Sequence, residues 1–233
     1  RTTSTVMKTP SSSHSSSPAT SQAIALEMRH GDADRLMSPS AARNRAPIAE
    51  LLAGILPENA QVLEIGSGTG EHAVAACQAR ADIRWQPSDP DAQSRRSQAA
   101  WASEADGRIS EPLALDLRDP DWFASAGAPD ALVCINVIHI SPWVVTEHLA
   151  AGAAALLPAG APIYLYGPYQ EGEATAPSNL DFDRSLKARN PEWGVRALSD
   201  VIAVFDRAGF DLESRTGMPA NNLSLVFRKR EAS

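Results

Sequence analysis

Cysteine and long hydrophobic runs are both scarce in this sequence. The 233 residues include two cysteines, Cys77 and Cys134, with the spacing of neither a metal site nor a redox pair. We therefore expect both to be buried free thiols in a reducing compartment, as in a cytoplasmic protein. No apolar run approaches the ~20 residues that a membrane-spanning helix needs. These shortages predict a protein with no metal site and no membrane partner.

Positive charge is also in short supply. Lys and Arg number 21 against 28 Asp and Glu, which gives a formal net charge of −7. This balance argues against a large phosphate-binding surface, so we expect no nucleic-acid partner. Hydrophobic residues make up 43% of the chain, and its length is enough for one α/β domain with a substantial core. The composition predicts no particular oligomeric state.

The N-terminal residues differ in composition from the rest. Residues 1–28 are rich in Ser and Thr, and such a segment buries too little apolar surface to become ordered. We therefore expect a disordered tail over 1–28 and a single folded domain over 29–230.

A glycine-rich loop follows the first strongly apolar run. The run 61–65 suits a buried parallel strand, and the loop after it contains Gly66, Gly68 and Gly70. Glycines let the backbone turn sharply and approach a ligand closely. Residues 71–81 are predicted to form a helix, so a ligand would meet the loop and a helix N-terminus together. The loop predicts a nucleotide-type site, with a tight turn of no function as the alternative.

Strands alternate with helices over the remainder of the chain. We expect strands at 61–65, 83–85, 113–115, 131–135, 163–166, 210–215 and 222–228, and helices at 47–56, 71–81, 92–105, 144–157 and 199–208. This order predicts an α/β fold with a doubly wound, mostly parallel seven-stranded sheet. No helix separates the last two strands, so the final strand should be antiparallel. Residues 167–197 interrupt the alternation, and we expect them to form an ordered, lid-like insertion.

Two acids are expected at the carboxyl edge of this sheet, where ligands bind in open α/β folds. Asp89 lies 19 residues beyond Gly70, a distance at which an acid accepts hydrogen bonds from ribose hydroxyls. Asp91 is its competitor, and either acid could instead cap the next helix. Asp116 follows the strand at 113–115 and could meet an adenine amino group, with Leu117 beside the ring. The alternative for Asp116 is a solvated loop acid.

The segment after the strand at 131–135 carries a histidine and a tryptophan. His139 could act as a general base, because the reference pKa of histidine, about 6.5, lies near working pH. It could equally bond to the backbone and shape the loop. Trp143 could stack on a substrate or anchor the next helix. Asn221 should reach the same edge from the terminal hairpin.

Several motifs resemble known methyltransferases. The pattern E-x-G-x-G-x-G, beginning at Glu64, resembles motif I of the class I S-adenosylmethionine-dependent methyltransferases, and the terminal β-hairpin is typical of their Rossmann-like fold. Dinucleotide dehydrogenases use G-x-G-x-x-G instead. Longer stretches at 38–44, 135–143, 164–169, 176–183, 191–196 and 218–226 resemble the methyltransferase-like protein 26 family, whose bacterial relatives were long filed as a domain of unknown function. The resemblance spans about residues 33–228.

The resemblance implies a methyltransferase that uses S-adenosyl-L-methionine on an unidentified small molecule. A non-catalytic module that binds the cofactor or its demethylated product is the alternative, and an NAD-dependent oxidoreductase is disfavoured by the glycine spacing and the hairpin. The expected cofactor residues are Glu64, Gly66, Ser67, Gly68, Gly70, Asp89, Asp116, Leu117 and Asn136. The expected catalytic residues are His139, Tyr166 and Asn221. The expected acceptor-binding residues are Arg43, Asn44, Trp143, Tyr169, Asn179, Asp183, Trp193 and Arg196.

Overall fold

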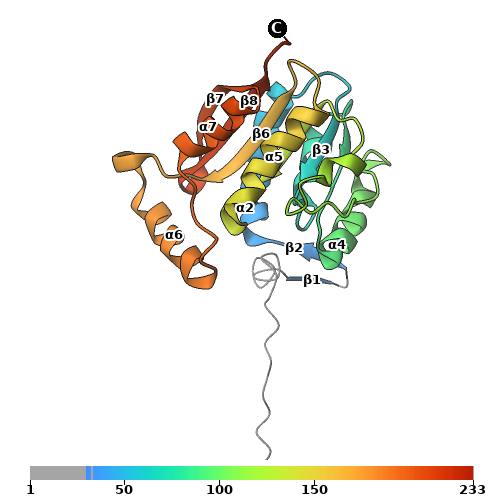
Figure 1. The fold of residues 1–233 in the computed structure, drawn as a ribbon. Helices are drawn as coiled ribbons and strands as arrows, with labels where there is room; N and C mark the ends of the chain where they lie inside the picture. The colour runs from blue at the N-terminus through green and yellow to red at the C-terminus, as the bar shows by residue number, and fades with distance from the viewer. Residues whose placement is uncertain (1–29, 33, 233) are drawn as a thin grey trace, which may run out of the picture.

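A six-stranded mixed sheet forms the centre of the protein in the computed structural model, which describes residues 30–32 and 34–232 (Figure 1). The strand order is β4-β3-β5-β6-β8-β7. The strands are β3 (Gln61–Ile65), β4 (Arg84–Gln86), β5 (Ala131–Ile135), β6 (Pro162–Pro168), β7 (Phe210–Met218) and β8 (Asn222–Lys229). β3 to β6 are mutually parallel, and β8 is antiparallel to both β6 and β7. The predicted α/β class and terminal antiparallel hairpin are confirmed, whereas the predicted tail over 1–28 lies outside the described residues.

The prediction of a seventh strand at 113–115 is wrong. Residues 109–113 run beside β4 and the residues that follow it, but they make only isolated bridges, Trp85 with Ile109 and Ser88 with Leu113. Pro87 and Pro112 interrupt the ladder because proline has no N–H to donate. The segment still ends at the carboxyl edge of the sheet.

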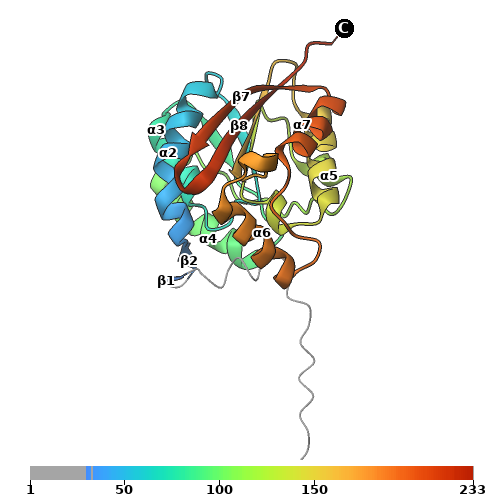
Figure 2. The same ribbon diagram turned by 90° about the vertical axis from the view of Figure 1, so that its left-hand side faces the viewer.

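Helices cover both faces of the sheet (Figure 2). α2 (Pro39–Ile55), α3 (Glu71–Ala79) and α4 (Ala92–Ala102) lie over one face, where Trp85, Trp101 and Tyr164 share a buried core. α5 (Trp143–Leu156) and α7 (Leu198–Arg207) cover the other face around Leu149 and Phe205. Cys77 and Cys134 are buried free thiols, as expected. Short 3₁₀ turns are η1 (Ser103–Ala105), η2 (Trp122–Ser125), η3 (Ile138–Ile140), η4 (Gly172–Ala174) and η5 (Pro219–Asn221).

α2 begins earlier than the sequence predicted. Pro47 was expected in its first turn, yet the helix starts at Pro39 and Pro47 lies inside it. Buried Ala41 and Ile48, one on each side of Pro47, hold the two halves against the core. Burial of the helix face outweighs the hydrogen bond that an internal proline removes.

An N-terminal arm, residues 34–38, packs against α4. It includes β2 (Arg35–Met37), which pairs with β1 (His30–Asp32). The Leu36 amide donates to Ser97 Oγ at 2.9 Å, and Trp101 Nε1 donates to the Leu36 carbonyl at 2.8 Å. The Arg35 guanidinium lies 3.6 Å from the centre of the Trp101 ring. These contacts bring the arm next to the glycine loop.

The segment 167–197 packs against the loop after β5. It contains α6 (Pro177–Arg189), which lies to one side of the sheet in Figure 1. Tyr169 and Trp193 are buried, and Asp183 Oδ1 accepts from the Val195 amide at 2.9 Å. The segment is therefore folded onto the domain, and its role as a lid stays a prediction.

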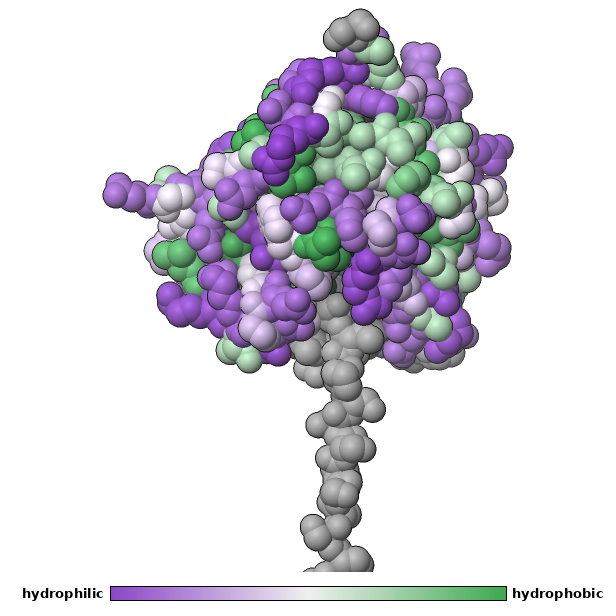
Figure 3. Space-filling view, viewed as in Figure 1, coloured by the Kyte–Doolittle hydropathy of each residue, from purple (hydrophilic) through white to green (hydrophobic). Residues whose placement is uncertain are grey.

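Hydrophilic residues interleave with small hydrophobic patches on the face drawn in Figure 3. Among the residues that the structure describes, the exposed large apolar side chains are Met37, Val144, Leu180 and Phe182, which are spread over three elements. Scattered exposures of this kind are ordinary for a folded surface. Within the described part of the chain, every helix is too short or too polar to cross a membrane.

Candidate functional site

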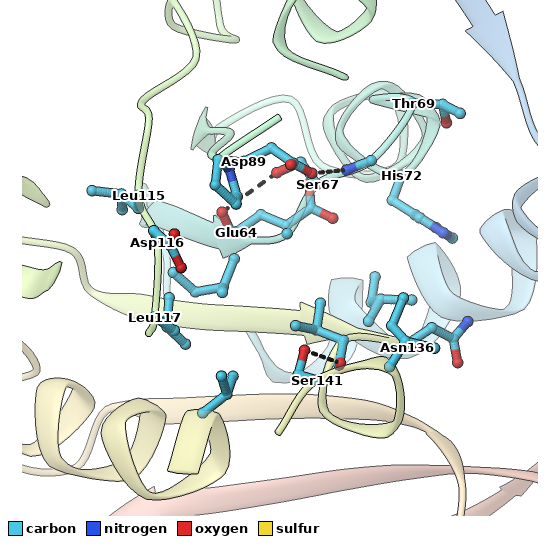
Figure 4. Close-up of a pocket in the computed structure, with 18 of the residues that line it drawn as sticks. Glu64, Ser67, Thr69, His72, Asp89, Leu115, Asp116, Leu117, Asn136 and Ser141 are labelled. Carbon is cyan, nitrogen blue, oxygen red and sulfur yellow. Dashed lines mark hydrogen bonds between the residues drawn. The ribbon is translucent and has the colours of Figure 1, made fainter. Parts of the chain in front are cut away.

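A cavity of about 190 Å³ opens at the carboxyl end of the parallel strands (Figure 4). The glycine loop and Glu64 form its floor, and Asp89 and Pro90 close one side. Ile135 to Val137, with Ile140 to Pro142, form the facing wall. Ser38, Ser40 and Ala41 at the start of α2 complete it. The glycine loop, the segment after β4, the segment 115–118 and the segment after β5 therefore meet around one space, whereas the terminal hairpin with Asn221 does not line it.

The glycine loop uses left-handed backbone at three positions. Gly66, Gly68 and Gly70 have φ values of 62°, 59° and 96°, which L side chains rarely adopt. A Cβ on Gly66 would lie 2.5 Å from Val137 Cγ2, and one on Gly70 would lie 2.8 Å from Gln98 Cα. Gly66 and Gly68 line the cavity, while Gly70 packs against α4 outside its lining.

Asp89 lines the cavity and also orders the glycine loop. Its Oδ2 accepts from the Gly68 amide at 3.0 Å, and its Oδ1 accepts from the Asp91 amide at 2.9 Å. Asp91 instead caps α4, since its Oδ2 accepts from the Ser94 amide at 2.7 Å. The structure thus separates the two competing acids into a cavity acid and a helix cap.

Glu64 is a buried acid beneath the loop. Only 1% of its surface is exposed, and its Oε1 accepts from Trp85 Nε1 at 3.1 Å. Burial raises the pKa of Glu64 to about 8, against the opposing effect of the Trp85 hydrogen bond. This carboxyl is therefore largely protonated in neutral solution.

Asp116 and Leu117 lie at the opposite end of the cavity from His72 and Asn136 (Figure 4). Arg118 pairs with the Asp116 carboxylate, with Nε 3.0 Å from both oxygens. Hydrogen bonds from Arg118 lower the pKa of Asp116. Apolar side chains of Leu115, Leu117 and Val145 line this end, so it can hold a flat ring beside a polar edge.

His139 lies behind the cavity wall and does not line the space. It is 2% exposed, and its Nδ1 accepts from the Arg196 amide at 3.3 Å. Burial, with the Arg196 cation nearby, lowers the pKa of His139 to about 3. With Nδ1 as the acceptor, the neutral ring carries its hydrogen on Nε2. This geometry matches the loop-shaping alternative better than a proton acceptor.

Arg196 and Asn179, both expected on the acceptor side, bond to backbone carbonyls instead of lining the cavity. Arg196 donates to the carbonyls of Ile138 at 3.1 Å and Ser141 at 2.5 Å, and its guanidinium lies 5.6 Å from the Trp143 ring centre. Asn179 Nδ2 donates to the carbonyls of Tyr169 at 3.2 Å and Asn221 at 3.1 Å. Absent from the cavity lining are Arg43, Asn44, Trp143, Tyr166, Tyr169, Asn179, Asp183, Trp193, Arg196 and Asn221.

Sequence reasoning placed Arg43 and Asn44 of α2 at the site but missed Ser38, Ser40 and Ala41, which line the cavity, and it left His72 without a role. His72 is half-buried in the first turn of α3 and lines the cavity. Its Nδ1 is fully buried and meets no hydrogen-bonding partner within residues 30–32 and 34–232. Burial and the Arg45 cation lower the pKa of His72 to about 4, so its imidazole is neutral. Its position directly after the glycine loop was the available signal.

The described residues contain no cluster of three or more His, Cys, Asp or Glu side chains arranged to hold a metal ion. The family model described as "Protein of unknown function (DUF938)" matches residues 35–229. The chain belongs to the DUF938 family. A closer link to methyltransferase-like protein 26 stays a prediction.

The DUF938 chain is similar in fold to solved methyltransferase structures. It matches mitomycin 7-O-methyltransferase with a TM-score of 0.70 and 16% identity, over 83% of this chain and 55% of that one. An O-methyltransferase family protein from Burkholderia thailandensis gives 0.69 and 15%, over 80% and 56%. A methyltransferase of calicheamicin biosynthesis in its SAH-bound form gives 0.68 and 16%, over 82% and 54%. The DUF938 chain spans about half the length of these proteins, and at such identities the likeness concerns the fold.

Proposed function

We propose that this DUF938 protein is a class I methyltransferase that moves a methyl group from S-adenosylmethionine to a hydroxyl group of a small molecule. The charge of the cavity carries the proposal. Glu64, Asp89 and Asp116 line it. Glu64 is largely protonated, and Asp116 is paired with Arg118, the one Lys or Arg among the lining residues, so Asp89 gives the cavity its net negative charge. A pyrophosphate would meet carboxylates without a free cation, whereas a sulfonium carries the charge that such a site favours.

The side chains fit the adenosyl part of this cofactor. Asp89 would accept hydrogen bonds from the ribose hydroxyls, as predicted from its distance to the loop. Leu117 and Val145 would pack against the adenine, with Asp116 beside its amino group. Gly66 and Gly68 would let the backbone approach the sugar and the sulfur-bearing chain. When bound, the cofactor supplies an electrophilic methyl group.

The protein's own contribution is positioning and exclusion of water. The loop 136–142, braced by Arg196, faces the glycine loop across the cavity and would hold the acceptor. Well-oriented reactants gain effective molarities of ~10⁵ M or more, so a strong base is not required for every acceptor. A hydroxyl acceptor is supported by the similar O-methyltransferase structures, one of which is described as a complex with apigenin.

Calorimetry followed by a labelling experiment tests the proposal. The protein should bind S-adenosylhomocysteine and leave NAD unbound, and methyl label from the cofactor should enter hydroxylated small molecules. Binding of NAD without binding of adenosylhomocysteine would overturn the proposal. Binding without label in any acceptor would instead favour the non-catalytic module.

A further inference from the structure

Asn136 holds an unassigned amide at the wall of the cavity. It lines the cavity directly after β5, on the side away from Asp116 and Leu117, and its backbone amide donates to the Tyr166 carbonyl at 2.9 Å. Its φ of 57° is left-handed, a conformation that asparagine and aspartate adopt more readily than other residues with a side chain. Within residues 30–32 and 34–232, the side-chain amide makes no hydrogen bond. This amide is therefore available to a ligand in the cavity.

The oxygen and the nitrogen of this amide face different surroundings. A Cβ on Gly167 would clash with His139 Nε2 and would lie 3.2 Å from Asn136 Oδ1, so these two polar atoms flank the same point over the glycine. In Figure 4, the nitrogen of the Asn136 amide points to the side of His72, another lining residue, and the oxygen points away from it. The oxygen thus lies over Gly167, and the nitrogen is directed towards the cavity.

His139 carries a hydrogen-bond donor without an acceptor beside the same point. Because its Nδ1 accepts from the Arg196 amide at 3.3 Å, its Nε2 carries the ring hydrogen. Nε2 is fully buried and has no hydrogen-bonding partner in the part of the chain that the structure describes. A buried N–H without an acceptor is costly. Asn136 Oδ1 is the acceptor that shares its place over Gly167.

The imidazole of His139 is held in place by its neighbours. The Gly194 amide donates to the His139 carbonyl at 2.9 Å, and the Tyr169 ring packs edge-on with its centre 5.1 Å from that of the imidazole. The charged neighbour is Arg196, whose cation disfavours a second proton on the ring. The Asn136 side chain is not bonded elsewhere, so a small rotation of it brings Oδ1 to this fixed donor.

We propose that His139 is a positioning residue that donates from Nε2 to Asn136 Oδ1, and that Asn136 presents its amide N–H groups to the methyl acceptor as a specificity-determining residue. The inference rests on the proposed function, because the acceptor is that of the methyl transfer. With its oxygen occupied by His139, the end of the amide that faces the cavity can only donate.

A donor at this place selects an oxygen nucleophile over an amine. A hydroxyl oxygen has two lone pairs, so one can accept from Asn136 while the other attacks the methyl carbon. The oxygen–carbon bond forms as the carbon–sulfur bond breaks, the hydroxyl hydrogen leaves as a proton to water, and S-adenosylhomocysteine departs uncharged at sulfur. A neutral amine has one lone pair, and accepting from Asn136 would occupy the pair that has to attack.

Asn136→Asp tests the contact with His139 without any turnover. Aspartate tolerates the same left-handed backbone and replaces the amide by a group that only accepts. In the ligand-free protein, the NMR signal of the hydrogen on His139 Nε2 should move downfield, because a carboxylate accepts a charge-assisted hydrogen bond. Asn59→Asp is the matched control, since Asn59 also has a left-handed φ, 54°, but is exposed and outside the cavity lining. An unmoved signal in Asn136→Asp, or an equal shift in Asn59→Asp, would overturn the proposal.

An aminophenol offers both nucleophiles within one molecule. Transfer of labelled methyl from S-adenosylmethionine to ortho-aminophenol and para-aminophenol, resolved by mass spectrometry, gives a ratio of methoxy to methylamino product. Asn136→Asp should lower this ratio roughly tenfold or more, because a carboxylate accepts from the amine N–H and leaves the nitrogen lone pair free. His139→Leu should lower it too, since the amide can then turn, and His139→Gln, which keeps an N–H donor, should restore most of it.

A ratio that none of these variants changes, or a wild-type protein that prefers the amine, would contradict the selection of oxygen. Absence of S-adenosylhomocysteine binding by the wild-type protein would remove the proposed function instead. The NMR comparison of Asn136→Asp with Asn59→Asp would still decide whether His139 contacts residue 136.

Discussion

The buried acid beneath the glycine loop makes the folded protein less stable as pH rises. Glu64 is fully enclosed, and its pKa is about 8 in the folded protein against an ordinary value of 4.5. Between these two values the unfolded chain ionises this carboxyl, while the folded protein keeps it protonated. Unfolding then releases a proton, so the free energy of unfolding falls with pH across this window.

The size of the effect follows from the same two values. Each pH unit inside the window costs about 1.4 kcal/mol, so the loss reaches on the order of 4 kcal/mol by pH 8. Glu64→Gln abolishes the titration, and its amide oxygen can still accept the hydrogen bond from Trp85 Nε1. The variant should therefore gain stability over the wild type steadily from about pH 5 to pH 8 and level off above.

Urea unfolding of the ligand-free protein, followed by circular dichroism from pH 5 to pH 9, measures this difference. Glu50→Gln removes a carboxyl from the exposed side of α2 and controls for the loss of one negative charge. If the difference between Glu64→Gln and the wild type is the same at every pH, the burial argument fails. It also fails if Glu50→Gln shows the same pH dependence as Glu64→Gln.

Three further substitutions probe the site and its support. Asp89→Asn should weaken adenosylhomocysteine binding about tenfold by calorimetry, because it removes a charged hydrogen-bond acceptor from the cavity. Asp91→Asn is the control: asparagine can still cap α4, so the affinity should stay unchanged. Gly167→Ala should destabilise the fold by roughly 1–3 kcal/mol in thermal unfolding, because the new Cβ would lie 2.4 Å from His139 Nε2. The control is Gly217→Ala, whose Cβ would meet nothing within 4 Å. Equal effects of the two substitutions would contradict the predicted clash. Arg196→Ala should lower the free energy of unfolding by about 2 kcal/mol, because it removes the hydrogen bonds to the carbonyls of Ile138 and Ser141. Arg189→Ala, at an exposed position, is the control. Equal stability of the two variants would show that the loop 138–141 keeps its structure without Arg196.

Much of the fold could be predicted because short hydrophobic runs, which form strands, alternate regularly with helical segments along the chain. The run 61–65, the glycine loop and the helix after it match β3 and α3, and the missing helix between the last two strands predicted the β7–β8 hairpin. The prediction of a strand at 113–115 was wrong because the hydrophobic pattern does not show that Pro87 and Pro112 face each other's segments. Neither proline has an N–H to donate, so the ladder between the two segments is interrupted. The predicted start of α2 at Pro47 was also wrong. Proline usually stands in the first turn of a helix, but here packing of the helix against the core keeps Pro47 inside it.

The site was predictable only where topology determines position. Asp89, Asp116 and Asn136 follow strands or edge segments, and all three line the cavity. His139 lies three residues beyond Asn136, yet η3 carries it behind the wall, where the Arg196 amide occupies its Nδ1. A turn of 3₁₀ helix decides which side chains face the cavity, and the sequence pattern carries little information on it. The contribution of α2 depends on packing between segments far apart in the chain.

The hydroxyl of Ser97 accepts from the Leu36 amide at 2.9 Å and donates to the Thr69 carbonyl at 2.7 Å. One small side chain on α4 therefore joins the arm to the glycine loop, although no strand of the central sheet takes part. A shortened protein beginning at residue 39 would keep all six strands and give an ordinary circular dichroism spectrum. It would nevertheless lose Ser38 from the cavity wall and the Leu36 amide that bonds to Ser97, so intact secondary structure in such a protein would say nothing about an intact site.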